Sequence, residues 1–426
     1  MTLFYFLIYN LLFVPVLFLA SHLAMFFNQK LRQGVLGRYR IFETLRRNAT
    51  QYASHPVMVV HCASLGEYEH IKPFLREFKR VRPDFRTIVL FFSPSGYRHA
   101  RPFSGVDLFL YAPFEWFLSL WRFHRMVRPA LWIIAKHDVW PNQVWMAHWL
   151  GVPIFLINAS LHDQSSRLLI YSRAFHRNIY QKFTAILAVS DADRNNFLKL
   201  ADASRVQTVG DTKYDQVFYR RDESRKKAVL PLAVIQNRWI FVAGSTWPED
   251  HRHLLPAIRS VMETHSEFLA IICPHEPTDA HLRELLEAFP EDQRILYSEM
   301  NQYREQSVII VDQVGILANL YSAGKVAYVG GSFKQNIHNV LEAAVYEIPV
   351  LFGPVNQNSH EAQLLKANGG AYQVHDAREI EQYLRKFLTN DIFRQEVGKR
   401  AFQVVQQNAG ATRRTVEVIL QSLPDA

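Results

Sequence analysis

The chain has 426 residues, a formal net charge of +9, 13% aromatic residues and 20% charged residues. A chain of this length is usually too long to fold around a single hydrophobic core, so we expect two domains. The composition excludes a disordered chain. The cysteines, Cys62 and Cys273, are too few for a disulfide framework or a cysteine-based metal site, and they fit a reducing compartment. The positive net charge favours an anionic partner.

A long apolar stretch lies at the N-terminus. Residues 3–27 contain no Asp, Glu, Lys or Arg, and a helix of this length can cross the hydrocarbon core of a bilayer, about 30 Å thick. A signal peptide is the alternative, but no basic segment precedes the stretch and no small-residue cleavage site follows it. The basic flank at 30–47 predicts a membrane anchor at 1–28 with the rest of the protein in the cytoplasm. Because Pro15 and His22 interrupt the stretch, a helix that only enters the membrane interface stays open.

Short apolar runs alternate with helical patterns in the first half of the chain. We expect strands at 57–62, 87–92, 131–135, 153–157, 185–189 and 206–209. Helical patterns fill most of the gaps, for example at 68–80 and 191–200. Strands and helices in alternation are typical of βαβ units and a parallel sheet.

A charged segment at 219–237 has few strand signals, and we interpret it as a linker. The alternation then resumes, with strands expected at 239–244, 268–273, 308–311, 326–330 and 349–353, and helices at 249–264, 313–322, 337–346 and 358–367. The last stretch, about 391–421, is helical in pattern, and we expect that it can pack back across the domains. The sequence therefore predicts an α/β fold of two Rossmann-like doubly wound domains, 29–218 and 238–426, that face a shared cleft.

Three glycine-rich turns follow strands in the second half: VAGSTWPED, GGSFKQNIHNVLEAA and GPVNQNSHEA. Glycine lets the backbone approach a phosphate, and a helix N-terminus offers free N–H groups to an anion. Three such turns at one end of a sheet predict a nucleotide site. The candidates in the first two turns are Gly244, Ser245, Thr246, Gly330, Gly331 and Ser332. The motifs GxxxxGK[ST] and GxGxxG are absent, which argues against P-loop, nicotinamide and flavin enzymes.

Polar residues at strand ends each have two interpretations. Glu67 in HCASLGEYE either caps a helix as a first-turn acid or takes a proton from an attacking hydroxyl. Lys213 in VGDTKYD either is a solvated loop lysine or neutralises a leaving group. Asn339 and Glu342 either form a capping pair or bring the Glu342 carboxylate to a ribose diol.

Seven motifs occur in an order that resembles one family: HCASLGE, AKHDVWPN, VGDTKYD, AGSTWPED, CPHEP, VGGSFKQNIHNVLEAA and PVLFGP. The chain resembles the 3-deoxy-D-manno-octulosonic acid (Kdo) transferases over nearly its whole length. The resemblance implies a GT-B glycosyltransferase that moves Kdo from CMP-Kdo to the lipid A precursor, lipid IVA, with inversion of the anomeric centre. The acceptor is a phosphorylated, acylated glucosamine disaccharide, and the pathway is lipopolysaccharide biosynthesis. The implied location is the cytoplasmic side of the bacterial inner membrane, with no metal and no cofactor.

The resemblance also assigns roles to matching positions. Glu67 corresponds to the general base, and Asp138 and Lys213 correspond to residues that stabilise the transition state. The matching donor-binding segments comprise Pro274, His275, Val314, Gly315, Ile316, His338, Asn339, Val340, Leu341 and Glu342. The loop FFSPSGYRH follows a strand of the first domain, and we expect acceptor contacts from Ser93, Ser95 and Gly96.

Three segments depart from the usual pattern of the family. Lys136-His137-Asp138 stands where Glu-Thr-Glu is common, Pro274-His275-Glu276 replaces Pro-Arg-His, and Val314-Gly315-Ile316 replaces Met-Gly-Glu. Because Glu67, Lys213 and the segment 339–342 are intact, these departures indicate a divergent branch of the family and not lost activity. Two other functions stay open. One is a membrane-associated GT-B transferase or epimerase that uses a UDP-sugar, and the other is a catalytically silent scaffold that binds nucleotide.

The run IKPFLREFKRVRPDFR (71–86) is basic. Lys72, Arg76, Lys79 and Arg80 fall on one helical side, which either is a solvated face or attracts the anionic membrane surface and the phosphates of the acceptor. No nucleic-acid motif accompanies the basic charge, so we expect no nucleic-acid partner.

Overall fold

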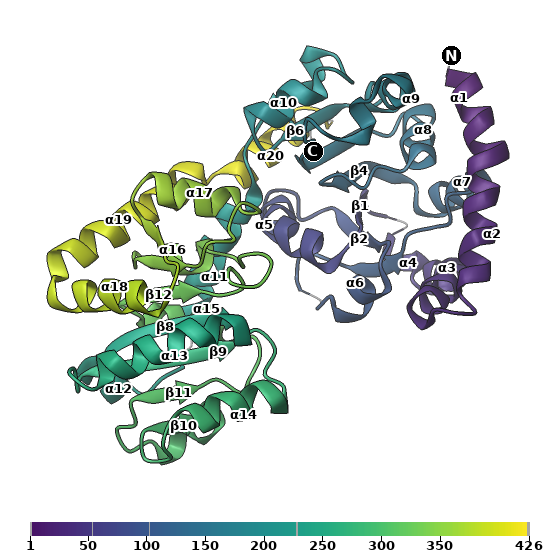
Figure 1. Ribbon diagram of the computed structural model, residues 1–426. Coiled ribbons are helices and arrows are strands. Elements are labelled where there is room, and N and C mark those ends of the chain that lie inside the picture. The colour runs from purple at the N-terminus through teal and green to yellow at the C-terminus, as the bar shows by residue number, and fades with distance from the viewer. Residues whose placement is uncertain (1, 53, 102, 227–228, 424–426) are drawn as a thin grey trace. The chain divides into compact units, whose positions relative to one another are not determined.

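The computed structural model describes residues 2–52, 54–101, 103–226 and 229–423, and it divides into two compact units (Figure 1). The first unit comprises 1–216 and 409–426, and the second comprises 217–408. In the described residues each unit contains one parallel sheet of seven strands. The two Rossmann-like domains predicted from the sequence are confirmed.

The sheet of the first unit has the strand order β3-β2-β1-β4-β5-β6-β7. Its strands are β1 (Val57–Cys62), β2 (Arg86–Phe91), β3 (Leu108–Tyr111), β4 (Pro129–Ala135), β5 (Ile154–Ala159), β6 (Ala185–Ala188) and β7 (Val206–Thr208). Side chains alternate between the two faces of a strand. In β1, Val57 and Val59 join one buried cluster while Met58 and Val60 join another, so helices cover both faces.

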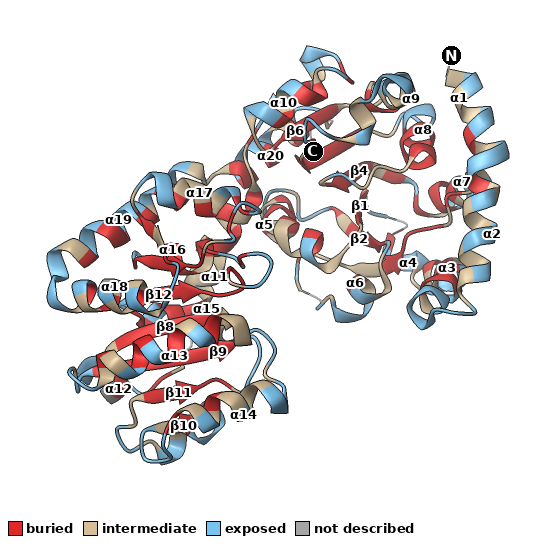
Figure 2. Cartoon of the chain, viewed as in Figure 1, coloured by how far each residue is buried: buried red, intermediate tan, exposed pale blue. Residues whose placement is uncertain are grey.

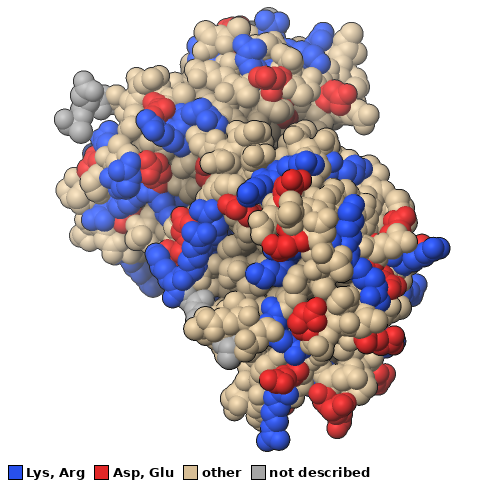
Figure 3. Space-filling model, turned by 90° about the vertical axis from the view of Figure 1, so that its left-hand side faces the viewer, with Lys and Arg blue, Asp and Glu red and all other residues tan. Residues whose placement is uncertain are grey.

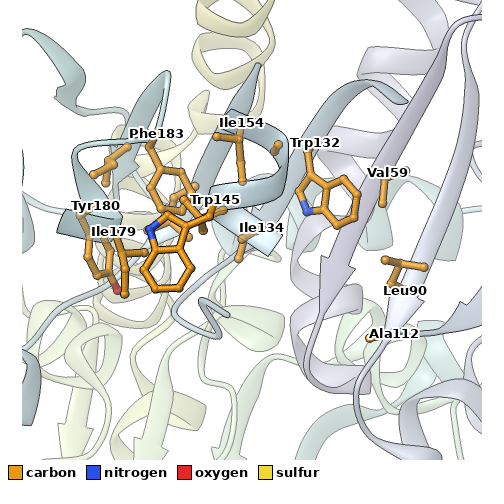
Figure 4. Packing of buried hydrophobic residues seen from close by; sticks show 14 of the residues in the cluster. Val59, Leu90, Ala112, Trp132, Ile134, Trp145, Ile154, Ile179, Tyr180 and Phe183 are labelled. Carbon is orange, nitrogen blue, oxygen red and sulfur yellow. The ribbon is translucent and has the colours of Figure 1, made fainter. Parts of the chain in front are cut away.

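The helices of the first unit pack on both faces of this sheet. They are α3 (Gln29–Arg47), α4 (Ala49–Tyr52), α5 (Leu65–Val81), α6 (Pro94–His99), α7 (Phe117–Val127), α8 (Pro141–Trp149), α9 (Ile170–Tyr180), α10 (Asp191–Phe197) and α20 (Ala411–Leu420). Figure 4 shows Trp132 of β4 near Val59 and Leu90, and Trp145 of α8 near Ile179, Tyr180 and Phe183. Both indoles are fully buried, and they contact neighbouring helices: Trp132 meets Phe123 of α7, and Trp145 meets Phe175 of α9.

The C-terminal helix α20 belongs to the first unit, whereas the sequence analysis assigned it to the second domain. Asp215 accepts hydrogen bonds from the backbone N–H groups of Gly410 (2.6 Å) and Thr412 (2.7 Å). Val416 and Ile419 then enter the buried cluster that contains α5. A carboxylate at the N-terminus of α20 and an apolar stripe along it therefore determine this placement.

The sheet of the second unit has the order β10-β11-β9-β8-β12-β13-β14. Its strands are β8 (Trp239–Thr246), β9 (Phe268–Pro274), β10 (Arg294–Leu296), β11 (Val308–Ile310), β12 (Val326–Val329), β13 (Val350–Phe352) and β14 (Ala371–Gln373). Its helices are α12 (Leu232–Asn237), α13 (Pro248–Met262), α14 (Asp279–Ala288), α15 (Leu317–Leu320), α16 (Leu341–Ala344), α17 (His360–Ala367), α18 (Ala377–Thr389) and α19 (Asp391–Asn408). Helix α11 (Thr212–Ser224) contains the boundary between the units and occupies 219–224 of the segment that we interpreted as a linker.

The N-terminal residues form a helix from Thr2 to Ala24 that is long and apolar enough to cross a membrane. It consists of α1 (Thr2–Ile8), a π-helical turn (Tyr9–Phe13) and α2 (Val14–Ala24). Its residues are mainly exposed or half-buried, and only Tyr9 and Val14 among them are buried (Figure 2). One side contacts the first unit, where Asn10 and Asn142 exchange side-chain hydrogen bonds of 2.9 and 2.8 Å.

The surface charges are mixed on the face drawn in Figure 3, where Lys and Arg lie next to Asp and Glu. Helix α5 shows the same mixing: Lys72 forms an ion pair with Glu69, and Arg80 forms one with Glu77 at 2.7 Å. Part of the basic side predicted for 71–86 is therefore neutralised within its own helix.

Candidate active site

Glu67 lies in the first turn of α5, directly after β1. Ser64 caps the helix, because its Oγ accepts a hydrogen bond from the backbone N–H of Glu67 at 3.3 Å. The backbone N–H of Ala63 in turn donates to Glu67 Oε2 at 2.6 Å. Glu67 therefore does contribute to the cap. Its second oxygen, Oε1, has no hydrogen-bond partner among the described residues, so capping leaves one oxygen available for chemistry.

Asp138 lies beside this turn, in the loop between β4 and α8. Since β1 and β4 are neighbours in the sheet, their carboxyl ends meet at one edge. His61 at the end of β1 is fully buried, and its Nε2 lies 2.8 Å from Asp138 Oδ2. Trp140 Nε1 donates to the same oxygen at 3.0 Å. The structure thus brings Glu67 and Asp138 together through His61.

The two carboxylates have pKa values shifted in opposite directions. Burial, and then the charge of Asp138, raise the pKa of Glu67, although the Ala63 N–H, His61 and Lys136 counteract this. Burial also raises the pKa of Asp138, but the hydrogen bonds from His61 and Trp140 outweigh it and the net shift is downward. Neighbouring carboxylates with divergent pKa values are typical of acid–base sites.

Lys213 lies at the start of α11, after the edge strand β7. Its Nζ is 3.2 Å from Asp211 Oδ2. The preceding residue, Thr212, donates from Oγ1 to the carbonyl of His70, one turn beyond Glu67 in α5. Asn158 Nδ2 also donates to Thr212 Oγ1, at 2.6 Å. These bonds fix the start of α11 on the helix that carries Glu67.

The predicted acceptor residues lie next to the Glu67 turn. The backbone N–H of Ser93 donates to the carbonyl of Ala63 at 3.0 Å, and the Ser93 and Ser95 hydroxyls are 2.7 Å apart. A Cβ on Gly96 would lie 2.7 Å from the Phe91 ring and 3.2 Å from the Leu65 nitrogen. Gly96 therefore permits α6 to approach the start of α5 closely.

In the second unit, the end of β8 and the turn after β12 are in direct contact; β8 extends to Thr246, so Gly244, Ser245 and Thr246 lie in the strand and not in the turn predicted to follow it. A Cβ on Gly330 would lie 2.3 Å from the carbonyl oxygen of Ser245, and a Cβ on Gly244 would lie 2.1 Å from the Tyr321 hydroxyl. Asp250 connects the two turns, because its Oδ2 accepts from the backbone N–H groups of Trp247 and Gly331, each at 2.9 Å.

An aromatic and imidazole cluster borders these turns. The rings of His275 and His338 stack with centroids 4.1 Å apart, and Trp247 Nε1 donates to His338 Nε2 at 3.0 Å. Burial, followed by the effect of His275, lowers the pKa of His338 to about 4, so this imidazole is a neutral acceptor at pH 7. The Lys334 ammonium lies 3.8 Å from the centroid of the Trp247 ring. The cluster offers flat ring faces and a cation next to the glycine turns.

The remaining donor candidates differ in what they can contribute. The helix predicted at 337–346 is shorter in the structure, where α16 begins at Leu341 and ends at Ala344. Glu342 forms an ion pair with Arg220 of α11, and Asn339 Nδ2 lies 3.4 Å from the same Glu342 oxygen. Side chains of four candidates are buried, so these residues can offer mainly backbone groups: Pro274, Ser332, Val340 and Leu341. By contrast, two lie in the exposed loop before α15: Val314 and Gly315.

Substitution of Gly330 tests the contact between the two turns. We expect Gly330→Ala to weaken CMP binding at least about tenfold, because the added methyl group meets backbone atoms of Ser245 and Thr246 that have to move. Gly66→Ala is the matched control, since a Cβ there comes no closer than 3.8 Å to a side chain. Calorimetric titration with CMP measures both, and equal affinities would contradict this account of the turns.

Sequence reasoning missed four side chains that organise these sites: His61, Trp140, Trp247 and Arg220. Three of them stand inside motifs that we had already identified. His61 had a usable signal, because an imidazole at the end of an apolar strand needs a polar partner when it is buried. Arg220 had none, since its partner Glu342 is 122 residues away.

Comparisons with known proteins identify the family of the chain. A family model described as "3-Deoxy-D-manno-octulosonic-acid transferase (kdotransferase)" matches residues 35–216. The 3-deoxy-D-manno-octulosonic acid transferase of Chlamydophila psittaci is 30% identical over 328 residues, which cover 74% of this chain and 73% of that protein. The Haemophilus influenzae transferase is 25% identical over 372 residues, 84% of this chain and 86% of that protein.

Solved structures share the two-sheet fold. The UDP-GlcNAc 2-epimerase of Neisseria meningitidis bound to UDP-GlcNAc has a TM-score of 0.58 at 14% identity, and the match covers 86% of this chain and 100% of that one. A glycosyltransferase from Rickettsia africae has a TM-score of 0.53 at 11% identity over 87% and 100%. The predicted GT-B fold class is confirmed. With the sequence relatives, these findings establish that the chain belongs to the 3-deoxy-D-manno-octulosonic acid transferase family.

Proposed function

We propose that this protein transfers Kdo from CMP-Kdo to the lipid A precursor, lipid IVA, in lipopolysaccharide biosynthesis, with inversion of the anomeric centre. Family membership supports the Kdo transfer. The observation that carries the chemistry is the Glu67 turn, where a buried carboxylate has one unpartnered oxygen beside an ionised Asp138. The donor and the acceptor that we name extend beyond what the relatives establish.

Glu67 acts in this proposal as the general base. Its Oε1 takes the proton of the acceptor hydroxyl, whose oxygen then attacks the anomeric carbon of Kdo from the face opposite the phosphate. The bond to CMP breaks, and CMP leaves with the bonding electrons. A raised pKa suits Glu67 to this step, because a stronger base accepts a proton more readily.

Other residues hold the substrates and balance charge. The glycine-rich segments around Gly244 and Gly330 lie against the CMP phosphate, while Lys213 and Asp138 stabilise the transition state. Fixed donors aimed at a leaving phosphate need no reorganisation during the reaction. The N–H groups of Gly330 and Gly331 already donate to the Gly244 carbonyl and to Asp250, so these glycines allow the phosphate to approach and do not themselves bind it. Since Arg220 already binds Glu342, a ribose diol would share this carboxylate with a guanidinium.

We expect the reaction to take place at a membrane, because the proposed acceptor is a lipid. A phosphorylated, acylated disaccharide is a lipid, and the apolar helix Thr2–Ala24 is long enough to hold the protein in the bilayer that contains it. We place the catalytic units on the cytoplasmic side of the bacterial inner membrane. There, Ser93, Ser95 and Gly96 contact the acceptor beside Glu67.

A transfer assay tests the proposal. We expect the purified full chain to form a Kdo-disaccharide product from CMP-Kdo and a tetra-acylated, bis-phosphorylated disaccharide in detergent, with EDTA present. CMP should compete for the donor site more strongly than UDP. Tighter UDP binding without product would favour the UDP-sugar alternative. CMP binding without transfer to this acceptor would contradict the proposed reaction and favour the silent scaffold.

A further inference from the structure

A cavity of about 300 Å³ lies in the first unit, bordered by α2, α3 and the loops that follow β2 and β3. Its size is at the lower end of the range for small-molecule sites, about 300–1,000 Å³. The lining is mainly apolar and includes Leu17, Phe18, Val35, Phe114, Trp116 and Trp140. One wall is thus the helix that is long enough to cross a membrane.

The cavity also contains a buried cation, Arg38, which is only 9% exposed. Its guanidinium donates to the carbonyl of Phe92 at 2.9 Å and lies 4.7 Å from the centroid of the Phe92 ring. Burial lowers the pKa of Arg38 to about 10, which still leaves it charged at pH 7. No carboxylate forms an ion pair with Arg38 in the part of the chain that the structure describes.

The carboxyl group in the lining, Glu115, does not balance this charge. Its Oε1 accepts from the backbone N–H of Asn142 at 2.6 Å, and burial raises its pKa to about 8. Glu115 is therefore mostly protonated at neutral pH. A buried charge without a counter-charge is costly, so the cavity favours an occupant that presents an anionic or carbonyl oxygen to Arg38.

The cavity adjoins the candidate active site. Phe92 stacks on Trp140 with centroids 5.0 Å apart and an interplanar angle of 20°. Trp140 lines the cavity and also donates to Asp138. An apolar chain in the cavity would therefore have its polar end near the carboxylates that we assign to catalysis.

We propose that this cavity holds an acyl chain of the lipid acceptor, and that Arg38 pairs with an oxygen at the polar end of that chain. The inference rests on the proposed function, which supplies the lipid acceptor. The inference adds a site that determines substrate specificity. The apolar cavity beside the N-terminal helix selects an acylated substrate, and the Arg38 cation selects one that presents oxygen atoms able to accept hydrogen bonds.

Photo-crosslinking tests where the chain lies without depending on transfer. The probe is the phosphorylated disaccharide with a diazirine in one acyl chain, added to the full protein in detergent, and labelled residues are mapped by mass spectrometry. We expect labels on Phe18, Val35 or Phe114 that excess unlabelled acceptor competes away. Labels elsewhere would overturn the inference. Equal labelling by a diazirine phospholipid, with no competition by the acceptor, would overturn the acceptor as occupant.

Two variants, Ser21→Trp and Arg38→Gln, each with its own control variant, give a kinetic test. Ser21→Trp fills the cavity from α2, and Leu19→Trp places the same side chain on the exposed side of that helix as the control. We expect Ser21→Trp and Arg38→Gln to raise KM for the acylated acceptor about tenfold or more, with CMP affinity unchanged. A de-acylated disaccharide should show no such difference, and Arg38→Lys should recover most of the loss.

The two experiments separate the inference from the proposed function. Cavity labelling by the acceptor without any Kdo transfer would support the chain site and contradict the proposed reaction. Transfer by the wild-type protein, with Ser21→Trp and Leu19→Trp showing the same KM for the acylated acceptor, would overturn the inference and leave the reaction standing.

Discussion

Glu67→Gln is expected to reduce kcat for Kdo transfer by about 10²–10⁴-fold, the usual contribution of a positioned general base. A glutamine oxygen can still accept the hydrogen bond from the Ala63 N–H, so the cap of α5 is retained. What is lost is the group that takes the proton. Steady-state kinetics of the full chain measure this, and CMP affinity should stay unchanged because the donor turns lie in the second unit.

The pH dependence of the transfer rate tests the direction of the pKa shift of Glu67. Burial raises the pKa of Glu67, so wild-type activity should fall as pH decreases through a value above the ordinary range of a glutamate. The residual activity of Glu67→Gln should lack this acidic limb. The effect of pH on stability has the opposite sign, because burial favours the protonated form of Glu67. The contribution of protonated Glu67 to the free energy of unfolding is complete at low pH and is lost as pH rises through its folded-state pKa. The amide should therefore not destabilise the protein at neutral pH.

Glu69→Gln is the control for this experiment. Glu69 lies in the same helix, where it pairs with Lys72, and it has no assigned part in proton transfer. We expect transfer rates within about twofold of the wild-type rate, because the half-buried Glu69–Lys72 pair contributes modestly to helix stability and takes no part in the proton transfer. If both glutamine variants retained full activity, Glu67 would be reduced to a capping residue.

The fold could be predicted from the sequence mainly where strands are buried. The strands that the sequence analysis missed, β3, β10 and β14, are all at sheet edges. Two of them have only three residues, RIL and AYQ, and such short segments give little periodicity. The internal strands β1, β4 and β9 are continuous apolar runs, as expected of parallel strands covered on both faces.

The sequence predicted where the candidate site residues stand along the chain, at the ends of strands, but not which side chains they contact. Glu67, Asp138 and the glycine turns lie at strand ends, where the order of strands and helices alone places them. The partners of these residues were not predictable, because His61 and Asp138 are 77 residues apart and only the pairing of β1 with β4 brings them together. Arg38 was noted only as part of a basic flank, and its burial depends on the packing of α3.

The segments that we propose to bind the donor are connected by a buried carboxylate, Asp250, and its removal should have the largest effect on stability. Asp250 is fully buried, and it accepts hydrogen bonds from the backbone N–H groups of Trp247 and Gly331 and from the Tyr328 hydroxyl, at 2.8 Å. Burial, and then the charge of Asp250, raise the pKa of Tyr328, so this hydroxyl stays protonated and continues to donate. Asp250→Ala would leave these donors without an acceptor. Two of these donors, the Gly331 N–H and the Tyr328 hydroxyl, are buried, and each unsatisfied buried donor costs about 1–3 kcal/mol, so we expect the opening of β8 and β12 to become easier by about 2–6 kcal/mol.

Hydrogen–deuterium exchange on the full chain measures this effect locally. In Asp250→Ala, amides of β8 and β12 should exchange faster, while amides of β1 and β4 in the first unit should keep the protection of the wild-type protein. The matched control is Asp279→Ala, which removes an exposed first-turn carboxylate of α14 and should cost about 0.3–1 kcal/mol. CMP affinity should fall with Asp250→Ala only, because the same carboxylate orients the two segments that we propose to lie against the phosphate. Normal exchange together with lost CMP binding would make Asp250 a ligand-contacting residue instead of a structural one.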